Sequence, residues 1–217
     1  MKVIVAIVKN EPHLREWVEY HIQIGFQHVY LYVNDWPDCP SDIPNTTLIM
    51  WPGRAQQLPA YNHALRNIKF DWAFFGDADE YIVCPEGLDN FLKHQDYSIA
   101  MPWVIMGNRE SEGSTVTERF QHWDYDPNGH VKTIVKGGYN ARFNNPHFVV
   151  DAPTVTPRGQ KHYGSFTSEK PGRLFIRHYY YQDKQYWETK IERGRADTGT
   201  TRTEKWEQGE NFNTNQI

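Results

Sequence analysis

The chain has 217 residues and a formal net charge of −4 at pH 7. That length can bury the core of one large domain or of two small ones, and we predict a single α/β domain over residues 1–217. The acidic balance excludes a broad cationic surface, so nucleic acid and acidic membranes are not expected as partners. The 2 cysteines, Cys39 and Cys84, form no CxxC motif, which indicates neither a disulfide framework nor a structural zinc site and favours a reducing compartment.

The amino-terminal stretch MKVIVAIVKNEP predicts a strand followed by a turn. Its run of about six apolar residues before Lys9 is too short for the apolar part of a signal peptide or for a membrane-spanning helix. Residues 3–8 are continuously apolar and β-branched, which is typical of a strand buried on both faces of a parallel sheet. Apolar residues then recur at helical spacing over 14–22 until Gly25, and His21 on the apolar face is predicted to belong to the core.

The next segments continue an alternation of strands and helices. We predict strands at 28–33, 46–51 and 72–75, and a helix that begins at Pro59. Such an alternation favours a doubly wound, mostly parallel sheet, in which ligands bind beyond the carboxyl ends of the strands. The loops expected at that edge are 9–11, 34–38, 53–57 and 77–80.

The pattern changes after a short helix predicted at 86–94. A strand at 98–106 is followed by polar and β-branched residues over 120–150, with glycine and asparagine turns that are typical of antiparallel strands. One more strand and a helix starting near Asp183 come next. We divide the domain into 1–95, 96–194 and a polar segment, 195–217, that we predict to be a flexible or ligand-ordered tail.

The stretch FFGDADEYI places three carboxylates directly after a buried strand: Asp77, Asp79 and Glu80. Two aspartates separated by one residue can share a hard cation such as Mn²⁺ or Mg²⁺, which would cancel their repulsion, and a diphosphate would supply the remaining oxygen ligands. The alternative is a solvated acidic loop. The position at the binding edge of the sheet favours the metal site.

Longer stretches resemble a known family. KNEPHLREWVEYHIQIGFQHVYLYVND followed by WAFFGDADEYI resembles the GT-A nucleotide-sugar glycosyltransferases, specifically family 92. The RF pair at Arg119 and Phe120, KTIVK at 132–136, His147 and RHYYYQDKQYWETKIERG continue the resemblance in the same order. The resemblance implies a GT-A fold with an antiparallel extension on the acceptor side, in which 1–95 binds the nucleotide sugar and 96–194 binds the acceptor.

The resemblance also implies roles for individual residues. Asp77, Asp79 and His178 would be the metal ligands, Asp79 and Glu80 would act in catalysis, and Trp103 and Asn108 would contact the acceptor. The residues implied for donor binding are Lys9, Asn10, Glu11, Asn34, Asp35, Gln56, Gln57, Tyr61, Asn62, Asp77, Ala78, Lys184, Lys190 and Arg193. Other interpretations of some of these residues stay open: His178 as a structural histidine, Trp103 as core, and Lys190 and Arg193 as an exposed helix face.

The predicted activity is the metal-dependent transfer of a hexose from a uridine diphosphate (UDP) sugar, such as UDP-glucose, to a hydroxyl of a glycan or glycoprotein. A divalent cation and nearby cationic side chains would stabilise the charge on the leaving diphosphate. The catalytic base and the stereochemical course stay open; the candidate carboxylates are Glu110, Glu112, Asp124, Asp126 and Asp151. Two alternative functions are a sugar nucleotidyltransferase and a non-catalytic carbohydrate-binding module.

The length of the chain is similar to that of bacterial members of the family, and of the compact glycosyltransferase module of a large chlorella virus. With no signal peptide or membrane span expected, we predict a cytoplasmic location, in the host cytoplasm if the protein is viral.

Overall fold

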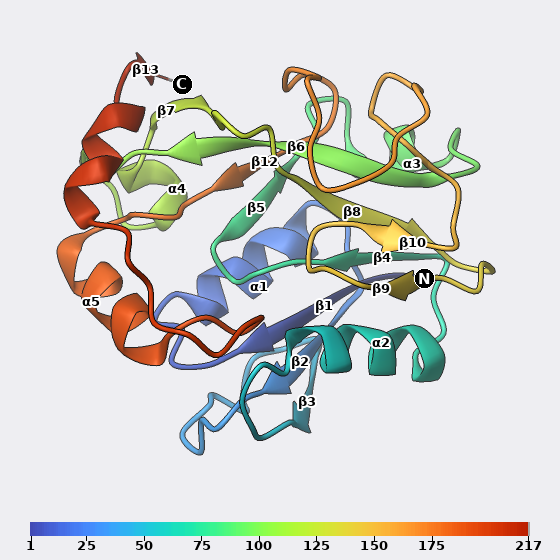
Figure 1. The fold of residues 1–217 in the computed structure, drawn as a ribbon, viewed down its shortest axis with the longest axis horizontal. Helices are drawn as coiled ribbons and strands as arrows, with labels where there is room; N and C mark the ends of the chain where they lie inside the picture. The colour runs from blue at the N-terminus through green and yellow to red at the C-terminus, as the bar shows by residue number, and fades with distance from the viewer. Residues whose placement is uncertain (217) are drawn as a thin grey trace.

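The first half of the chain forms a parallel sheet. A computed structural model describes residues 1–216. Its first strands are β1 (Lys2–Val8), β2 (His28–Val33), β3 (Thr46–Met50) and β4 (Trp72–Phe75). They lie side by side in the order β3, β2, β1, β4, and all neighbouring pairs are parallel (Figure 1). The predicted strands of this half are therefore confirmed.

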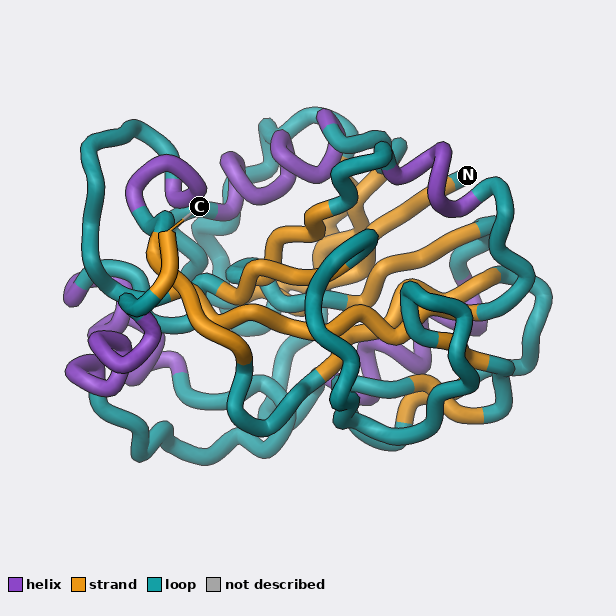
Figure 2. Tube along the Cα trace, turned by 90° about the horizontal axis from the view of Figure 1, so that it is seen from above, coloured by secondary structure: helices purple, strands orange, loops and turns teal. Residues whose placement is uncertain are grey.

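Strand β1 is buried on both faces because its side chains alternate between two cores. Ile4, Ala6 and Val8 join the core that also contains helix α1 (Leu14–Gln23). Val3, Val5 and Ile7 join the core that contains helix α2 (Gln57–Asn67). Seen from above, the strands form a central layer with helices on both sides (Figure 2). His21 is 0% exposed in the first core, which confirms its prediction as a core residue.

The second half adds antiparallel strands to the same sheet. These strands are β5 (Glu80–Val83), β6 (Ser98–Met106), β7 (His122–Tyr125), β8 (Val131–Lys136) and β12 (Phe175–His178). Strand β8 is antiparallel to both β4 and β6, β7 is antiparallel to β6, and β12 runs parallel to β6 and antiparallel to β5. The result is an α/β fold around a mixed, 11-stranded sheet with one parallel half.

The remaining elements are short. They are α3 (Leu88–Leu92), α4 (Val116–Arg119), β9 (Arg142–Phe143), β10 (Val149–Val150), β11 (Thr154–Val155), α5 (Lys184–Arg193), η1 (Trp206–Phe212) and β13 (Asn215–Gln216). Helix α5 begins where predicted because the Asp183 side chain accepts a hydrogen bond from the Tyr186 N–H at 2.8 Å, which caps the helix. Helix α2 begins at Gln57, earlier than the predicted start at Pro59. Across residues 1–216, every helix is too short or too polar to cross a membrane.

The segment after Gly194 makes defined contacts with the rest of the fold. Helix η1 packs beside β6 and β7, and β13 pairs antiparallel with β7. We had expected a flexible or ligand-ordered tail here. Its flexibility stays a prediction, but its place is at the side of the sheet that carries α5 (Figure 1).

Candidate active site

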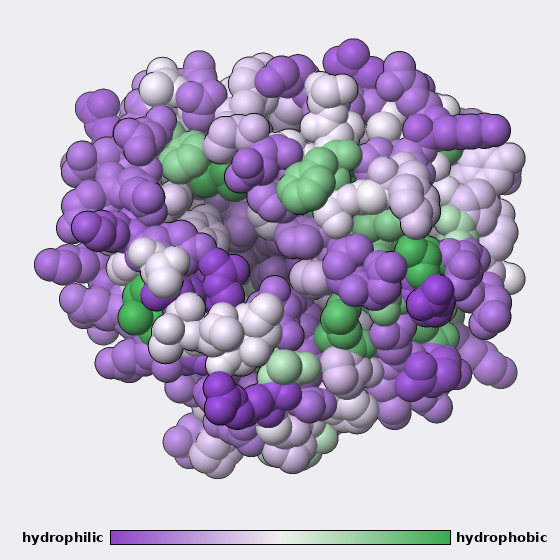
Figure 3. Space-filling view, viewed as in Figure 1, coloured by the Kyte–Doolittle hydropathy of each residue, from purple (hydrophilic) through white to green (hydrophobic). Residues whose placement is uncertain are grey.

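A cavity of about 640 Å³ opens beyond the carboxyl ends of the parallel strands. Residues that follow β1, β2 and β4 line one side of it, including Lys9, Asn34 and Asp77. Trp103 of β6 and His178 of β12 line the other side. Figure 3 shows the opening as a hollow surrounded mostly by hydrophilic residues. The loops predicted at the binding edge of the sheet do meet at one cavity.

Two aspartates and two lysines form what we call the acid–lysine group: Asp77, Asp79, Lys132 and Lys190. The Lys132 ammonium donates to Asp77 Oδ2 at 3.0 Å, and the Lys190 ammonium donates to Asp79 Oδ2 at 2.5 Å. The other Asp77 oxygen, Oδ1, accepts a hydrogen bond from Gln57 Nε2 at 2.6 Å. Each carboxylate therefore faces its own cation, and this separates the charges of two acids that are only two residues apart.

The acid–lysine group is ionised at neutral pH although it is largely removed from water. The side chains of Asp79 and Lys190 are only 4% and 1% exposed. Burial alone would raise the pKa of Asp79, but the Lys190 ammonium outweighs it and holds that pKa well below its usual value. Burial and Lys132 oppose each other in the same way at Asp77, and its pKa is lowered.

Glu80 lies beneath this group and not at the cavity. Its side chain is 0% exposed, and it is absent from the cavity lining. Glu80 Oε2 accepts a hydrogen bond from the Asp77 N–H at 2.9 Å, which closes the turn between β4 and β5. Burial raises the pKa of Glu80 well above its usual value, and Lys132 offsets this only in part. The structure thus gives Glu80 a supporting position, away from the cavity where a catalytic residue would be expected.

Four aromatic side chains form the opposite wall, which we call the histidine group: Trp103, His130, His147 and His178. The Trp103 ring centroid lies 4.3 Å from that of His178, 5.1 Å from that of His130 and 5.3 Å from that of His147. Burial lowers the pKa of His178, and burial followed by the charge of Lys132 lowers the pKa of His147 to about 3. These two rings are therefore neutral at pH 7.

Two buried polar atoms of the histidine group have no hydrogen-bond partner among the described residues. These atoms are Trp103 Nε1 and His178 Nδ1, and both are buried. On the other side of its ring, His178 Nε2 lies 3.5 Å from Asp79 Oδ1. The histidine group therefore adjoins the acid–lysine group directly. Buried polar atoms without partners are costly in a finished core and are commoner where a ligand binds.

Asp126 and His130 form a hydrogen-bonded pair at the rim of the cavity. His130 Nδ1 lies 2.6 Å from Asp126 Oδ2, and both residues line the cavity. Within the described chain, Asp126 is the only cavity-lining residue among the five carboxylates that the sequence left open as bases. Asp124, for example, accepts a hydrogen bond from Thr214 at 2.9 Å and is absent from the cavity lining.

The third side of the cavity is formed by the end of α5 and by the segment 194–205. Arg193 forms an ion pair with Glu11 at 2.5 Å and donates to the Lys9 carbonyl at 3.2 Å. The Arg54 side chain donates to the Gly199 carbonyl at 2.9 Å, and the Gln57 N–H donates to the Ala196 carbonyl at 3.2 Å. These hydrogen bonds attach the segment 194–205 to the first half of the chain at the edge of the cavity.

The structure brings many of the predicted site residues together at the cavity. Those that line it are Lys9, Glu11, Asn34, Asp35, Gln57, Asp77, Asp79, Trp103, His178, Lys190 and Arg193. His178 and Lys190 both contact Asp79, and the Lys190 side chain is only 1% exposed, so it is not part of an exposed helix face. Trp103 is only 8% exposed, which agrees with its interpretation as a core residue, but it also lines the cavity.

Other predicted residues do not reach the cavity. Besides Glu80, they are Asn10, Gln56, Tyr61, Asn62, Ala78, Asn108 and Lys184. Tyr61 is buried below Gly76, whose carbonyl accepts a hydrogen bond from the Tyr61 hydroxyl at 3.2 Å. Asn62 and Asn108 are bound to the backbone of Phe143 and Trp206, at 2.9 and 3.0 Å, and Lys184 is exposed at the start of α5.

Several cavity residues were not predicted as site residues. They are Arg54, His130, His147 and Arg202. The buried Lys132, which does not line the cavity but contacts Asp77 at 3.0 Å, was not predicted either. A signal was present for Lys132, because a lysine inside the strand VKTIVK sits among buried neighbours and needs a charged partner. His147 and KTIVK were part of the family resemblance but received no role.

The protein side chains alone do not form a complete metal site. Within residues 1–216, no group of three or more His, Cys, Asp or Glu side chains is placed to hold a metal ion. Two carboxylates, Asp77 and Asp79, and the neutral imidazole of His178 nevertheless line the cavity, and these are donor types that Mn²⁺ or Mg²⁺ accepts. A cation here would need ligands from a bound molecule in addition to Asp77 and Asp79.

Comparison with known proteins gives a consistent but partial match. No family model matches the chain. The chain is 26% identical to a glycosyltransferase family 92 protein of Oryza sativa subsp. japonica over 226 aligned positions, which cover 90% of this chain and 35% of that protein. It is also 26% identical to family 92 proteins of Ricinus communis and Arabidopsis thaliana, over 66% of this chain and 26% and 27% of those proteins. The chain thus spans about a third of the length of these curated relatives.

Among solved structures, a crystal structure of HddC from Yersinia pseudotuberculosis complexed with GMP-PN covers 64% of this chain and 70% of its own. It is 16% identical with a TM-score of 0.37, which is too low for a conclusion. By sequence, the protein is similar to glycosyltransferase family 92 proteins, and these relatives support a glycosyltransferase of that kind.

Proposed function

We propose that the protein is a glycosyltransferase with a GT-A-like fold that moves a hexose from a UDP-sugar to a hydroxyl of a glycan or glycoprotein. The observation that carries this proposal is the placement of Asp77 and Asp79 at the cavity beyond the parallel strands, with Lys190 and Arg193 beside them. The names of the family 92 relatives support the same class of reaction.

In this proposal the nucleoside binds between the loops that follow β1 and β2. The Asn34 amide group already donates to the carbonyls of Trp51 and Gly53 at 2.9 and 2.8 Å, so its side-chain oxygen is left to accept a hydrogen bond from uracil. The exposed Asp35 carboxylate is placed to accept hydrogen bonds from ribose hydroxyls. Both residues line the cavity on the side of the parallel strands.

The donor diphosphate would lie between the two acids and two arginines that also line the cavity. Arg54 and Arg202 line the cavity and have no carboxylate partner within residues 1–216. Arg193 and Arg195, in contrast, are paired with Glu11 and Glu204. Because guanidinium groups bind phosphate oxygens with two parallel hydrogen bonds, Arg54 and Arg202 would stabilise the charge of the leaving UDP.

We further propose that Asp77 and Asp79 hold Mn²⁺ or Mg²⁺ when the donor is bound, with His178 as a further ligand. When bound, the cation would withdraw charge from the diphosphate and so ease its departure. Asp79 is kept ionised by Lys190, and His178 is kept neutral by burial, which are the states in which both side chains can bind a cation.

Isothermal titration of UDP with and without Mn²⁺ tests this proposal. We expect Mn²⁺ to raise the affinity of the unmodified protein for UDP by about tenfold or more, and Asp79→Asn to abolish that gain. Asp38→Asn is the matched control, because Asp38 is exposed on the loop after β2 and does not line the cavity. Equal UDP affinity with and without Mn²⁺ would contradict the proposed role of the metal. Absence of UDP binding would contradict the proposal that the donor is a UDP-sugar.

The two alternative functions predict different products. Release of UDP from UDP-glucose by the purified protein, abolished by EDTA, would argue against a non-catalytic carbohydrate-binding module. A sugar nucleotidyltransferase would instead make pyrophosphate from UTP and a sugar phosphate. A scan of UDP-sugars for Mn²⁺-dependent thermal stabilisation would then identify the donor sugar.

A further inference from the structure

The His130 ring is held in a fixed orientation at the cavity. It stacks on Trp103 at 5.1 Å and 27°, and it packs against the rings of His147 and Phe166 at 5.1 and 4.8 Å. Its side chain is 25% exposed, and the residue lines the cavity. A ring that is enclosed by three aromatic neighbours and still reaches the cavity is suited to act on a bound molecule.

Asp126 fixes which nitrogen of His130 carries the proton. Its Oδ2 accepts hydrogen bonds from the His130 N–H at 2.7 Å and from the ring nitrogen Nδ1 at 2.6 Å, and its Oδ1 accepts one from the Asn128 N–H at 3.0 Å. Burial alone would raise the pKa of Asp126, but these hydrogen bonds outweigh it and lower that pKa. An ionised carboxylate has no proton to donate, so the neutral imidazole carries its proton on Nδ1.

The second ring nitrogen, Nε2, is therefore a free base. Within the described chain it has no hydrogen-bond partner. The charged or titratable groups that face the ring are Asp126 and His147, since Trp103 and Phe166 are uncharged and the nearby Lys132 is directed to Asp77. Because His147 is itself neutral, the acid that acts directly on His130 is Asp126.

The same wall connects His130 to the acids of the proposed donor site. Trp103 lies between His130 and His178, and His178 Nε2 is 3.5 Å from Asp79. A sugar in the cavity beside Trp103 would therefore have the acid–lysine group on one side and the His130 ring on the other. This is the arrangement that a base acting on an incoming hydroxyl requires.

We propose that His130 is the catalytic base of the transfer and that Asp126 is its positioning residue. The proposal rests on the function proposed above. His130 Nε2 takes the proton of the acceptor hydroxyl while the hydroxyl oxygen forms a bond to the anomeric carbon. The bond from that carbon to the diphosphate oxygen breaks, and its electron pair leaves with UDP. Asp126 balances the imidazolium, which then returns its proton to water; a single displacement of this kind inverts the anomeric configuration.

The first test is the tautomer of His130, and it needs no turnover. Nitrogen-15 NMR of the histidine rings in the full chain should show that the neutral form of His130 carries its proton on Nδ1. Asp126→Asn replaces an acceptor by an amide that can donate to Nδ1, so it should move the proton to Nε2. A proton on Nε2 of the unmodified protein would overturn the proposal whatever the donor proves to be.

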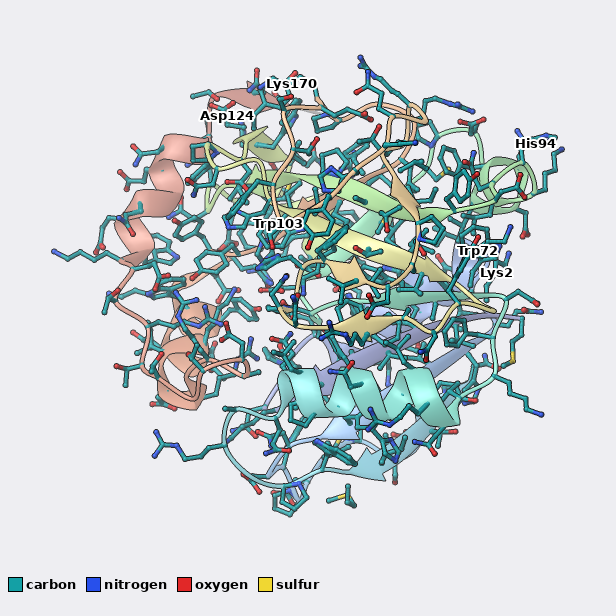
Figure 4. The ribbon with its side chains drawn as sticks, turned by 45° about the vertical axis from the view of Figure 1, so that its right-hand side comes forward. Lys2, Trp72, His94, Trp103, Asp124 and Lys170 are labelled. Carbon is teal, nitrogen blue, oxygen red and sulfur yellow. The ribbon has the colours of Figure 1, made fainter. Side chains whose placement is uncertain are left out.

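The second test measures UDP release from UDP-glucose with water as the acceptor. We expect His130→Ala to slow release by about 100-fold or more, and Asp126→Asn by about tenfold or more, while UDP affinity stays within about twofold. His94→Gln is the control, because His94 is exposed at the far end of the sheet from Trp103 (Figure 4) and should change nothing.

Added imidazole separates a chemical role from a structural one. It should restore UDP release in His130→Ala, where the missing ring leaves a space between Trp103 and Phe166, but not in Asp126→Asn. Unchanged rates in His130→Ala, or a loss that imidazole does not restore, would sink the base assignment. Absence of UDP binding in every variant and in the unmodified protein would instead count against the proposed function, and the tautomer result would still decide the orientation of His130.

Discussion

The cavity has two walls that are held together by different forces. The acid–lysine group consists of charges that are buried, ionised and paired, with Lys190 reaching Asp79 from 111 residues further along the chain. In the histidine group, burial lowers the pKa values of His147 and His178 and keeps both rings neutral. The group is fixed by ring packing around Trp103. The first wall depends on each partner being present, because a buried charge without its partner is costly. The second depends on shape and on staying neutral.

The largest effect should come from breaking one charge pair. Lys190→Met leaves the buried Asp79 carboxylate without its cation, and we expect it to lower the free energy of unfolding by about 3–5 kcal/mol in urea titrations. The double variant Asp79→Asn with Lys190→Met should recover most of that loss, because it removes both charges. If the double variant were no more stable than Lys190→Met, charge pairing would not be what holds this wall.

An exposed ion pair provides the matched control. Arg15 and Asp42 are 2.6 Å apart, but their side chains are 45% and 77% exposed. Arg15→Met should therefore lower the free energy of unfolding by less than about 1 kcal/mol.

A smaller change in the free energy of unfolding should come from the histidine group, when the pH is lowered. The pKa of His147 in the folded protein, about 3, lies below the value of about 6.5 expected for the unfolded chain. Between these values the unfolded chain binds a proton that the folded protein does not, so stability is full above about pH 6.5 and falls as the pH is lowered. Between about pH 7 and pH 5, His147 should account for a loss of up to about 2 kcal/mol.

The variant His147→Asn measures this contribution. Asparagine can still donate to the Val131 carbonyl, to which His147 Nδ1 is hydrogen-bonded at 3.1 Å, but it does not titrate. The variant should lose less stability than the unmodified protein over the same pH range in parallel urea titrations. Parallel curves for the two proteins would show that His147 is not kept neutral by the fold.

The smallest effect should come from a lysine on the same helix as Lys190. Lys184 is exposed and does not line the cavity, although the family resemblance implied a role in donor binding. We expect Lys184→Ala to change UDP affinity by less than about twofold, measured by the same titration as above. A larger loss would mean that the helix moves when the donor binds.

The order of the elements was predictable because it depends on local patterns. The continuous apolar run of β1 reflects its burial on both faces. The helical spacing of apolar residues in α1 reflects its burial on one face. The position of Asp77 and Asp79 at the cavity follows from the same logic, since the carboxyl ends of parallel strands share one edge.

Among the predicted site residues, those that lie away from the cavity differ from those that line it in the direction of their side chains. Glu80 is adjacent to Asp79, but Asp79 lies in the turn before β5, whereas Glu80 begins β5 and its side chain is fully buried. Lys190 and Arg193 are three residues apart on α5 and share a face, whereas Lys184, six residues before Lys190, lies on another. A resemblance to a sequence motif shows which residues correspond along the chain. It does not show on which face of a helix or strand each side chain lies.

Lys132 and His130 were missed for a different reason. Their partners, Asp77 and the ring of Trp103, lie on other elements, and the contacts exist only because β8 runs antiparallel between β4 and β6. The order of strands in that half cannot be read from hydrophobic periodicity. A buried lysine in a strand and an Asp four residues before a His were the available signals.

Strand β6 has a consequence for how related sequences can differ in length. It carries Trp103, pairs Met101 with Lys132 of β8, and pairs Ile105 with His178 of β12. Since a shift by one residue turns every side chain of a strand to the other face, an insertion or deletion within β6 would misplace contributors to both walls at once. The segment 194–205 meets the first half of the sheet through a few hydrogen bonds and has no such constraint. We therefore expect natural variation in chain length, and with it changes in the size of molecule admitted, to fall in that segment while β6 keeps its nine residues.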